Sequence, residues 1–329
     1  MPSWLNKYLS LIAGLLLDSL LFSATARAES HVLLSRSGTY PMVVALDQQQ
    51  RSWLQGKREL RVGSSAPDYP PFDLTASARD YEGLTADYLG ILASALDLPI
   101  KVQRFHSRLA AIKALEEGSI DLLGTSNGFE ADNPQLLLST PYAIDQPVLV
   151  TREGDSRSLP RDLAGLRLSL VHHYLPLDEV KALYPKAIIH SYPSTQNAIN
   201  SVAFGQTDVF LGDTVSAHYM ISKGHLKNIK MANFGKPQPH GFSFAVHRDN
   251  RQLLEMINTT LQAVPGSERD SIARRWNAGS NSLLASQKLQ LTEREEQWLS
   301  QHPVVKVVVN ETLAPLTFFD PLQIEYGYH

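Results

Sequence analysis

From Glu59 onward, short apolar runs alternate with longer segments in which apolar residues recur every three or four positions. The short runs predict strands at 60–63, 100–105, 120–124, 146–150, 166–171, 187–190, 208–211 and 242–246. The longer segments predict helices at 84–96, 109–115, 177–183, 195–204, 214–222, 253–264 and 267–276. Strands that alternate with helices predict α/β layers with largely parallel sheets, and the restart of the pattern near Leu166 predicts a second lobe.

The N-terminus reads as a secretory signal peptide of 28 residues. Lys7 precedes a largely apolar run at 9–22, and Ala26-Arg27-Ala28 provides a small-x-small cleavage site. We therefore expect cleavage after Ala28 and a periplasmic protein; the alternative is an amphipathic first helix of a cytosolic protein. No later run approaches the roughly 20 apolar residues that a membrane-spanning helix needs.

A repeat predicts a second copy of the same domain. Residues 46–54 (LDQQQRSWL) match residues 291–299 (LTEREEQWL), and in the same register Pro70 falls on Pro315. The second copy would begin near Leu291, and the chain holds little more than its first strand. The alternative is a short C-terminal extension that packs on the first domain.

Composition excludes several classes of function. The chain has no cysteine, so disulfides, thiolate metal sites, cysteine nucleophiles and a lipidated cysteine anchor are absent. A net charge of −3 gives no basic field for nucleic acid. The eleven histidines show no HxH or HExxH spacing, and no GxSxG, P-loop or GxGxxG motif occurs. We expect no metal, no cofactor, no nucleic-acid partner and no enzymatic activity.

Five ordered stretches carry a resemblance to a known family. They are 60–64 (LRVGS) with 69–72 (YPPF), 82–88 (EGLTADY), 118–125 (GSIDLLGT), 139–142 (STPY) and 205–213 (GQTDVFLGD). In this order the chain resembles the solute-binding proteins of family 3, which bind polar amino acids. It is similar above all to the tandem sensing regions of BvgS-like hybrid sensor histidine kinases, of which a Trp-Leu leader before the first strand is typical.

The resemblance implies the periplasmic binding protein type II fold, or Venus flytrap, in which two α/β lobes joined by two crossover strands close on a ligand. The implied parts are a signal peptide (1–28), a leader (29–52), the flytrap domain (53–278), a helical linker (279–298) and the start of a second flytrap domain (299–329). Lobe 1 would comprise about 53–143 and 239–278, and lobe 2 about 146–234.

Three functions follow from the resemblance as alternatives. The first is the solute-sensing input domain of a two-component sensor, with a second flytrap domain or a sensor kinase as partner and no kinase in this chain. The second is a free binding protein that delivers amino acids or related small polar solutes to the permease of an ABC importer. The third, which we consider least favoured, is an enzyme on this scaffold, such as a dehydratase of the cyclohexadienyl type.

The candidate ligand residues follow the predicted strands, where α/β folds bind ligands. Asp213 directly follows the apolar run 209–212; the resemblance matches it to the family's ammonium-binding Asp, and it would also serve as a helix N-cap. Thr125, Ser126 and Asn127 follow the strand 120–124, and their polar groups suit a carboxylate. A plain polar turn is the alternative for these three residues.

Further candidates lie in three other loops. Tyr69 and Phe72 would place a ring on the ligand, with packing beside the hinge as the alternative. His172 and His173 would make the cleft sensitive to pH near neutrality, with an exposed turn as the alternative. Thr195 would cap the helix 195–204 and face the cleft.

The sequence departs from the family's pattern at one position. Amino-acid binders carry an Arg a few residues after the strand that precedes Thr125, and its guanidinium forks to the ligand's carboxylate. Here residues 128–132 read GFEAD, and the next Arg is Arg152. A standard α-amino acid would lack its strongest anchor, which leaves a different small solute, or no ligand, as alternatives.

Overall fold

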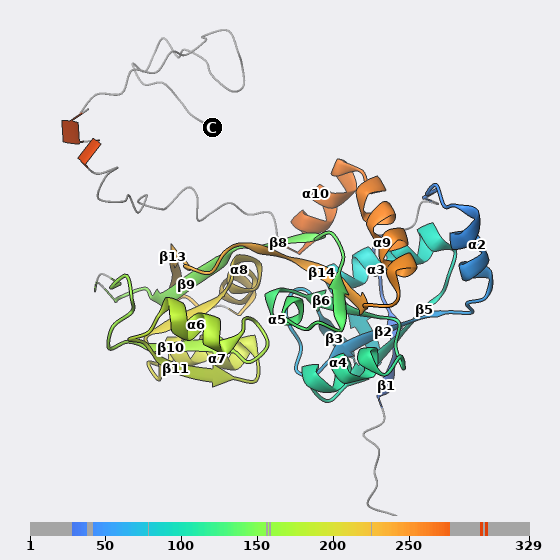
Figure 1. Cartoon of the computed structure of the whole chain (residues 1–329). Coiled ribbons are helices and arrows are strands. Elements are labelled where there is room, and N and C mark those ends of the chain that lie inside the picture. The colour runs from blue at the N-terminus through green and yellow to red at the C-terminus, as the bar shows by residue number, and fades with distance from the viewer. Residues whose placement is uncertain are drawn as a thin grey trace, which may run out of the picture. The chain divides into compact units, whose positions relative to one another are not determined.

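The chain forms two sheets, each with its own helices and core, that are joined by two crossing segments (Figure 1). The computed structural model describes residues 28–37, 42–77, 79–155, 157, 159–224, 226–276, 297–298 and 300–301. The predicted signal peptide, apart from Ala28, lies outside these residues, and so does the predicted start of the second domain, apart from Ser300 and Gln301.

Lobe 1 is built on a sheet that, within the described residues, has nine strands in the order β3-β4-β1-β5-β2-β6-β14-β7, with β8 paired to β14. Its strands are β1 (Glu29–Leu33), β2 (Leu60–Ser65), β3 (Leu74–Ser77), β4 (Asp80–Glu82), β5 (Ile100–Phe105), β6 (Leu122–Ser126), β7 (Leu136–Leu138), β8 (Ala143–Asp145) and β14 (His240–His247). Its helices are α2 (Gln48–Gln55), α3 (Leu84–Leu96), α4 (Arg108–Glu116), α5 (Gly128–Ala131), α9 (Arg251–Ala263) and α10 (Gly266–Arg275). The central strands β5, β2 and β6 are parallel, as the alternating pattern predicts.

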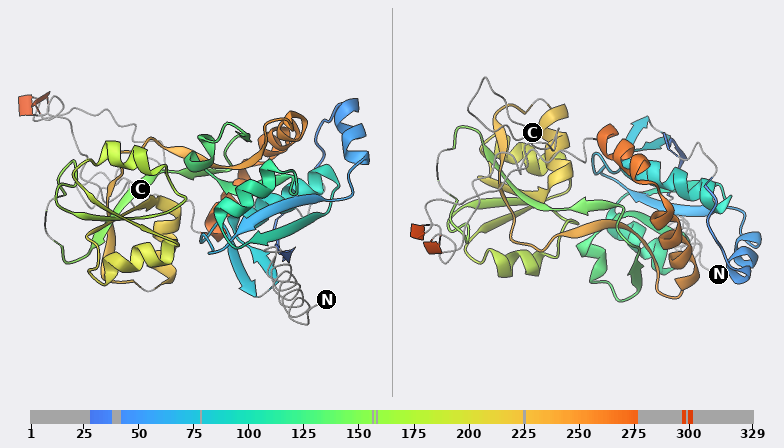
Figure 2. Two further views of the ribbon diagram at one scale, coloured as in Figure 1. Left: turned by 60° about the horizontal axis from the view of Figure 1, so that its bottom comes forward. Right: turned by 90° about the horizontal axis from the view of Figure 1, so that it is seen from above.

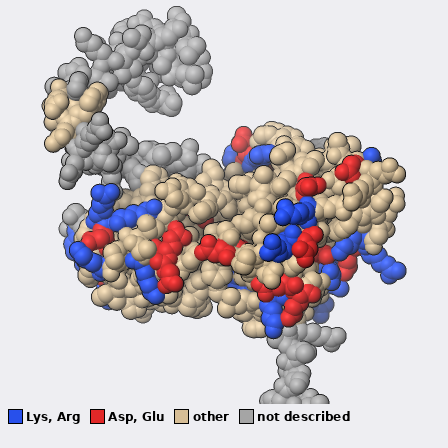
Figure 3. Space-filling model, in the orientation of Figure 1, with Lys and Arg blue, Asp and Glu red and all other residues tan. Residues whose placement is uncertain are grey.

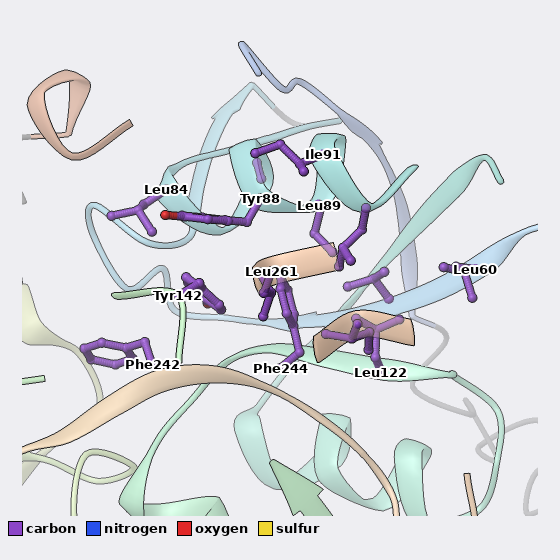
Figure 4. Close-up of a cluster of buried hydrophobic side chains, with 14 of the residues drawn as sticks. Leu60, Leu84, Tyr88, Leu89, Ile91, Leu122, Tyr142, Phe242, Phe244 and Leu261 are labelled. Atoms are coloured by element: carbon purple, nitrogen blue, oxygen red, sulfur yellow. The ribbon is translucent and has the colours of Figure 1, made fainter. Parts of the chain in front are cut away.

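Alternating residues of the central strands fill two cores, one on each face of this sheet. Leu122 belongs to the cluster under α3, α9 and α10, and the next residue, Leu123, to the cluster under α4. The period of two along a strand sends neighbouring side chains to opposite faces. Figure 4 shows the first cluster, with Leu84, Tyr88 and Leu89 of α3 facing the aromatic residues of the crossing strands.

Helix α3 starts at a position that only glycine can occupy. Gly83 has φ 130°, and an added Cβ would lie 2.1 Å from the carbonyl oxygen of Phe72. The close approach seats the first turn of α3 on the loop after β2, because the Leu84 and Thr85 amides donate to carbonyls of Pro71 and Phe72. The start of α3 is thereby fixed beside the loop that carries Tyr69.

Lobe 2 has a sheet of five strands in the order β11-β10-β12-β9-β13 in the part of the chain that is described. Its strands are β9 (Pro147–Arg152), β10 (Arg167–Val171), β11 (Ile188–Tyr192), β12 (Val209–Asp213) and β13 (Ile229–Phe234). Its helices are α6 (Leu177–Leu183), α7 (Thr195–Ala203) and α8 (Thr214–Lys223). Strands β10, β11 and β12 are parallel, and β9 and β13 run antiparallel to their neighbours.

Two segments connect the lobes side by side. The first leads from β8 into β9 at 145–147, and the second leads from β13 into β14 at 234–240. Asp145 pairs with His240 on the side of lobe 1, and Val148 pairs with Phe234 on the side of lobe 2. Both views in Figure 2 show these paired strands running from one sheet to the other, which is the arrangement of a hinge.

The structure corrects the predicted boundary of lobe 1. Residues 29–52 were expected to form a separate leader, but β1 pairs antiparallel with β5 and parallel with β4. The short strands β3, β4, β7 and β8 and the edge strand β13 were also not predicted. These strands are short or partly exposed, so they lack the continuous apolar run that marks β9 or β12.

The surface carries mixed charge. On the face drawn in Figure 3, Lys and Arg side chains are interspersed with Asp and Glu, and no broad patch of one sign covers either lobe. None of the helices among the described residues is long and apolar enough to cross a membrane.

Candidate functional site: a closed cavity between the lobes

A cavity of about 40 Å³ lies between the two lobes, next to the crossing strand β14. Its walls are Ser65, Ala66, Pro67, Asp68, Tyr69, Asp73, Arg108, Thr125, Asn127 and Phe242 from lobe 1 and the crossing strand, and Val171, His173, Pro193 and Ser194 from lobe 2. A water molecule needs roughly 10–15 Å³ measured in this way, so there is room for about three waters. The lobes are therefore closed on each other in this structure.

Thr125 forms the end of the lobe 1 wall and has a strained backbone. Its φ is 50°, in the left-handed region that a β-branched residue rarely adopts. The conformation is held by Tyr142, whose hydroxyl oxygen accepts from the Thr125 amide at 3.0 Å, and by Thr85, whose hydroxyl lies 2.7 Å from that of Thr125. Strain that the surroundings maintain in this way is typical of ligand-binding positions.

Arg108 lines the cavity and is the buried cation that the sequence analysis missed. Its Nε donates to Glu130 Oε1 at 2.7 Å, and its other nitrogens donate to the carbonyls of Gly124 and Thr125 and to the hydroxyl of Ser126. Arg108 and Glu130 are 6% and 1% exposed. A guanidinium has five N–H donors, so one remains beyond these four acceptors.

The Ser126 and Asn127 side chains mainly make hydrogen bonds within lobe 1. Ser126 is fully buried and is not among the cavity walls; its hydroxyl accepts from Arg108. Asn127 does line the cavity, and its side chain caps α5 by accepting from the Phe129 amide at 3.0 Å. Of the predicted carboxylate-binding triplet, the structure therefore brings Thr125 and Asn127 to the cavity.

On the side of lobe 2, His173 faces the cavity and His172 does not. Burial lowers the pKa of His173 to about 4, with smaller effects from Arg108 and His172. The predicted titration near neutral pH is thus corrected for His173, whose ring is neutral there. Its Nδ1 atom is buried and has no hydrogen-bond partner among the described residues, while His172 is exposed.

Ser194, rather than Thr195, caps helix α7. The Ser194 hydroxyl accepts from the Asn197 amide at 3.1 Å and lies at the cavity. Thr195 is 1% exposed, does not line the cavity, and its hydroxyl finds no partner within the described part of the chain. The predicted capping role of Thr195 is therefore corrected to its neighbour.

Tyr69 and Phe72, the two candidates for placing a ring on the ligand, point in different directions. Phe72 is fully buried in the lobe 1 core, with its ring centroid 4.0 Å from that of Phe242, and it does not reach the cavity. Tyr69 lines the cavity, and its hydroxyl donates to Asp213 Oδ2 at 2.9 Å. Asp213 is fully buried, and its Oδ1 caps α8 by accepting from the Ser216 amide at 2.7 Å.

A second buried carboxylate, Asp145, lies at the hinge. It accepts from the Tyr174 hydroxyl at 2.7 Å and is 1% exposed. Burial and the charge of Asp213 raise the pKa of Asp145 to about 8, and burial also raises the pKa of Asp213. Two neighbouring buried acids of this kind favour at least one retained proton at neutral pH.

We expect the free energy of unfolding to fall by about 1–2 kcal/mol between pH 6.5 and pH 8. Unfolded Asp145 is ionised throughout this range, whereas folded Asp145 keeps its proton until its pKa of about 8. The folded state thus binds more protons, so its stability decreases as the pH rises. Titration of His173 makes the free energy of unfolding rise with pH, which is the opposite effect. It acts below pH 6.5, because the pKa of His173 is lowered to about 4.

Urea unfolding at pH 6.5 and 8 in the wild type and in Asp145→Asn measures this effect. The amide keeps an acceptor for Tyr174 and cannot titrate, so the pH dependence should largely disappear in the variant. An equal pH dependence in both proteins would show that Asp145 is not its source.

Arg108, Asp73 and Asp145 escaped the sequence analysis for different reasons. Arg108 lies in the first turn of a helix, where the helix dipole disfavours a cation. This unfavourable position is a signal in the sequence that could have marked Arg108 as a residue with a specific partner. Asp73 follows an apolar loop residue and Asp145 ends the short strand β8, and neither carries a local sign of burial. Their burial depends on Tyr81 and Tyr174, which donate to them from other elements.

Comparison with known proteins places the chain in a family. Residues 60–279 match the bacterial extracellular solute-binding proteins, family 3. The virulence sensor protein BvgS of Bordetella parapertussis is 43% identical over 315 residues, which cover 95% of this chain and 25% of that protein. The arginine-binding periplasmic protein of Mannheimia haemolytica is 23% identical over 219 residues, 65% of this chain and 89% of that protein.

A solved structure agrees with these matches. The crystal structure of the Bordetella pertussis BvgS periplasmic domain superposes with a TM-score of 0.71 at 39% identity, covering 92% of this chain and 58% of that one. The present chain spans about a quarter of the length of the BvgS sensor protein that it resembles. With two α/β lobes, a two-strand hinge and an interlobe cavity, the chain belongs to the bacterial extracellular solute-binding proteins of family 3, and its fold is the Venus flytrap.

Proposed function

We propose that this chain is the periplasmic input domain of a BvgS-type two-component sensor, in which a small polar solute binds between the lobes. The main support is the 43% identity to the sensor protein over 95% of this chain, together with a polar cavity at the hinge. A ligand acts on such a domain only if it binds the closed and open forms with different affinity. Residues from both lobes line the cavity, so a bound solute would contact both only on closure.

Closure of the lobes would be transmitted to the next domain through the end of helix α10. This helix ends at Arg275 and leads toward the segment before the repeated Trp-Leu motif, where we propose that a second flytrap domain begins. The chain has no kinase motif and no catalytic set of residues, so we propose a binding function without enzymatic activity. Export follows from the signal peptide, with Glu29 as the mature N-terminus; β1 begins at that residue.

A second candidate function is that of a free binding protein for an ABC importer. It is favoured by the likeness to the arginine-binding periplasmic protein, of which this chain covers 89%. That relative is 23% identical, whereas the sensor protein is 43% identical. The sensor assignment is therefore the better supported of the two.

A thermal-shift screen tests whether the cavity binds a solute. We expect at least one compound among amino acids, polyamines, small carboxylates and nicotinate-like acids to raise the melting temperature of the wild type. His173→Ala should weaken the binding of this compound about tenfold, because His173 lines the cavity and its Nδ1 atom has no hydrogen-bond partner among the described residues. His172→Ala is the matched control, since the neighbouring ring is exposed and away from the cavity.

Two outcomes would contradict the proposal. One is a panel in which no compound stabilises the wild type at millimolar concentration. The other is a hit whose affinity is the same in His173→Ala, His172→Ala and the wild type, because that compound would bind somewhere else.

A further inference from the structure

The carboxylate of Asp213 is already satisfied by two donors of the protein itself. One oxygen accepts from the Ser216 amide at 2.7 Å, within lobe 2. The other accepts from the Tyr69 hydroxyl at 2.9 Å, and this bond crosses from lobe 1 to lobe 2. Because Asp213 is fully buried, an oxygen left without a donor would be costly.

Tyr69 also packs on both cores. Its ring contacts the hydrophobic cluster of lobe 1 and that of lobe 2. Its centroid lies 6.0 Å from those of Phe72 and Phe242. The loop is fixed by a turn in which the Tyr69 amide donates to Asp73 and the Phe72 amide donates to Tyr69. The hydroxyl is therefore held in place by lobe 1 before it meets Asp213.

Little space remains beside this contact. Tyr69 lines the cavity of about 40 Å³, which has room for about three waters. L-arginine has twelve heavy atoms, about four times as many as three waters, so it does not fit while the phenol is in place. If the phenol withdrew, a buried carboxylate oxygen would face the cavity, and the chemistry of that position favours an ammonium or guanidinium group.

We propose that Tyr69 determines the specificity of the cleft, because its hydroxyl occupies the position on Asp213 that a cationic amine would take and joins the two lobes. This inference rests on the proposed binding function of the same cavity. Burial raises the pKa of Tyr69, so the phenol remains a donor at neutral pH. A cationic amine must then displace Tyr69. Its apparent affinity is the intrinsic affinity multiplied by the fraction of molecules in which the phenol is withdrawn, so a small fraction gives weak binding.

The first experiment measures the separation of the lobes in the full chain without solute. The chain has no cysteine, so Lys113→Cys in α4 and Lys181→Cys in α6 provide unique sites for spin labels. We expect Tyr69→Phe to shift the interlobe distance distribution toward longer and broader values. Tyr81→Phe, the matched control, also removes a buried phenol that donates to a carboxylate, but its acceptor Asp73 belongs to the same lobe, so the distribution should stay unchanged.

The second experiment measures binding of L-arginine, a probe that carries an ammonium and a guanidinium, by titration calorimetry. We expect Tyr69→Phe to bind arginine at least about tenfold more tightly than the wild type does. Adding Asp213→Asn, which keeps an acceptor for the Ser216 amide, should abolish this gain. Tyr69→Leu repeats both measurements with the ring and the hydroxyl removed, should Tyr69→Phe fail to fold.

Each result decides the inference. An unchanged distance distribution in both Tyr69 variants would overturn the role of the phenol in joining the lobes. Arginine affinity that is equal in the wild type and the variants would overturn its role in specificity. Failure of either kind leaves the solute screen with His173→Ala unaffected, so it is distinguishable from failure of the proposed function.

Discussion

Replacing Arg108 with Met should lower the free energy of unfolding by about 3–5 kcal/mol, because it leaves the charge of Glu130 buried without a partner. The two side chains are 6% and 1% exposed, and their contact is 2.7 Å long. Arg108 also donates to carbonyls at the end of β6, which would lose their donors as well. Urea unfolding monitored by circular dichroism measures the loss.

Two further variants show whether the uncompensated charge is the cause. Adding Glu130→Gln to Arg108→Met removes the charge and keeps an acceptor for the Asn127 amide, so part of the stability should return. Lys113→Met is the control for an exposed ion pair and should change stability by less than about 0.5 kcal/mol. A loss in Arg108→Met as small as that control would mean that Glu130 finds solvent or another partner.

Arg108 also shows how far the sequence alone could lead. The helix predicted at 84–96 coincides with α3, and the helix predicted at 214–222 differs from α8 by one residue, because apolar periodicity records which side of a helix is buried. The buried ion pair of Arg108 and Glu130 produces no such periodic pattern in the sequence. Its partner stands 22 residues away, and neither residue shows locally that the other will neutralise it.

The same limit applies to the predicted site. The loops after β2, β6 and β10 each bring a residue to the cavity, as expected where parallel strands end at one edge of a sheet. Which side chain of each loop faces the cavity depends on the turn. Tyr69 faces the cavity and Phe72 faces the core, although both belong to one apolar loop of four residues. Alternation along the chain cannot distinguish them.

The second large effect is expected at Asp87, in the first turn of helix α3. Asp87 is fully buried and accepts from the Arg36 amide at 2.7 Å and from the Trp276 indole at 2.8 Å. It also accepts from the Arg275 guanidinium. One carboxylate thus ties the N-terminal segment and the end of α10 to the same helix.

Asp87→Ala should cost about 3 kcal/mol of stability, because three donors lose their acceptor and two of them are largely buried. The loss should be concentrated at the two ends that Asp87 holds. Hydrogen exchange should become faster in residues 35–37 and in the last turn of α10, while the lobe 2 strands keep their protection. Mass spectrometry of exchanged peptides measures both regions in one experiment.

The location of Asp87 relates this result to signalling. Two residues earlier on α3, the Thr85 hydroxyl lies 2.7 Å from that of Thr125 at the cavity wall. The same helix therefore contacts the cavity-lining Thr125 through Thr85 and the end of the domain through Asp87. Under the proposed sensor function, Asp87→Ala should therefore weaken the coupling between closure of the cleft and the end of α10.

Glu82→Gln is the matched control for Asp87→Ala. Glu82 pairs with the same Arg36, at 3.2 Å, but the Arg36 side chain is 60% exposed there, so little stability should be lost. Exchange in the last turn of α10 should stay slow in this variant, because the Asp87 bonds to Arg275 and Trp276 remain. Equal exchange in Asp87→Ala and Glu82→Gln would show that packing of the Trp276 ring, rather than the carboxylate, holds the end of the domain.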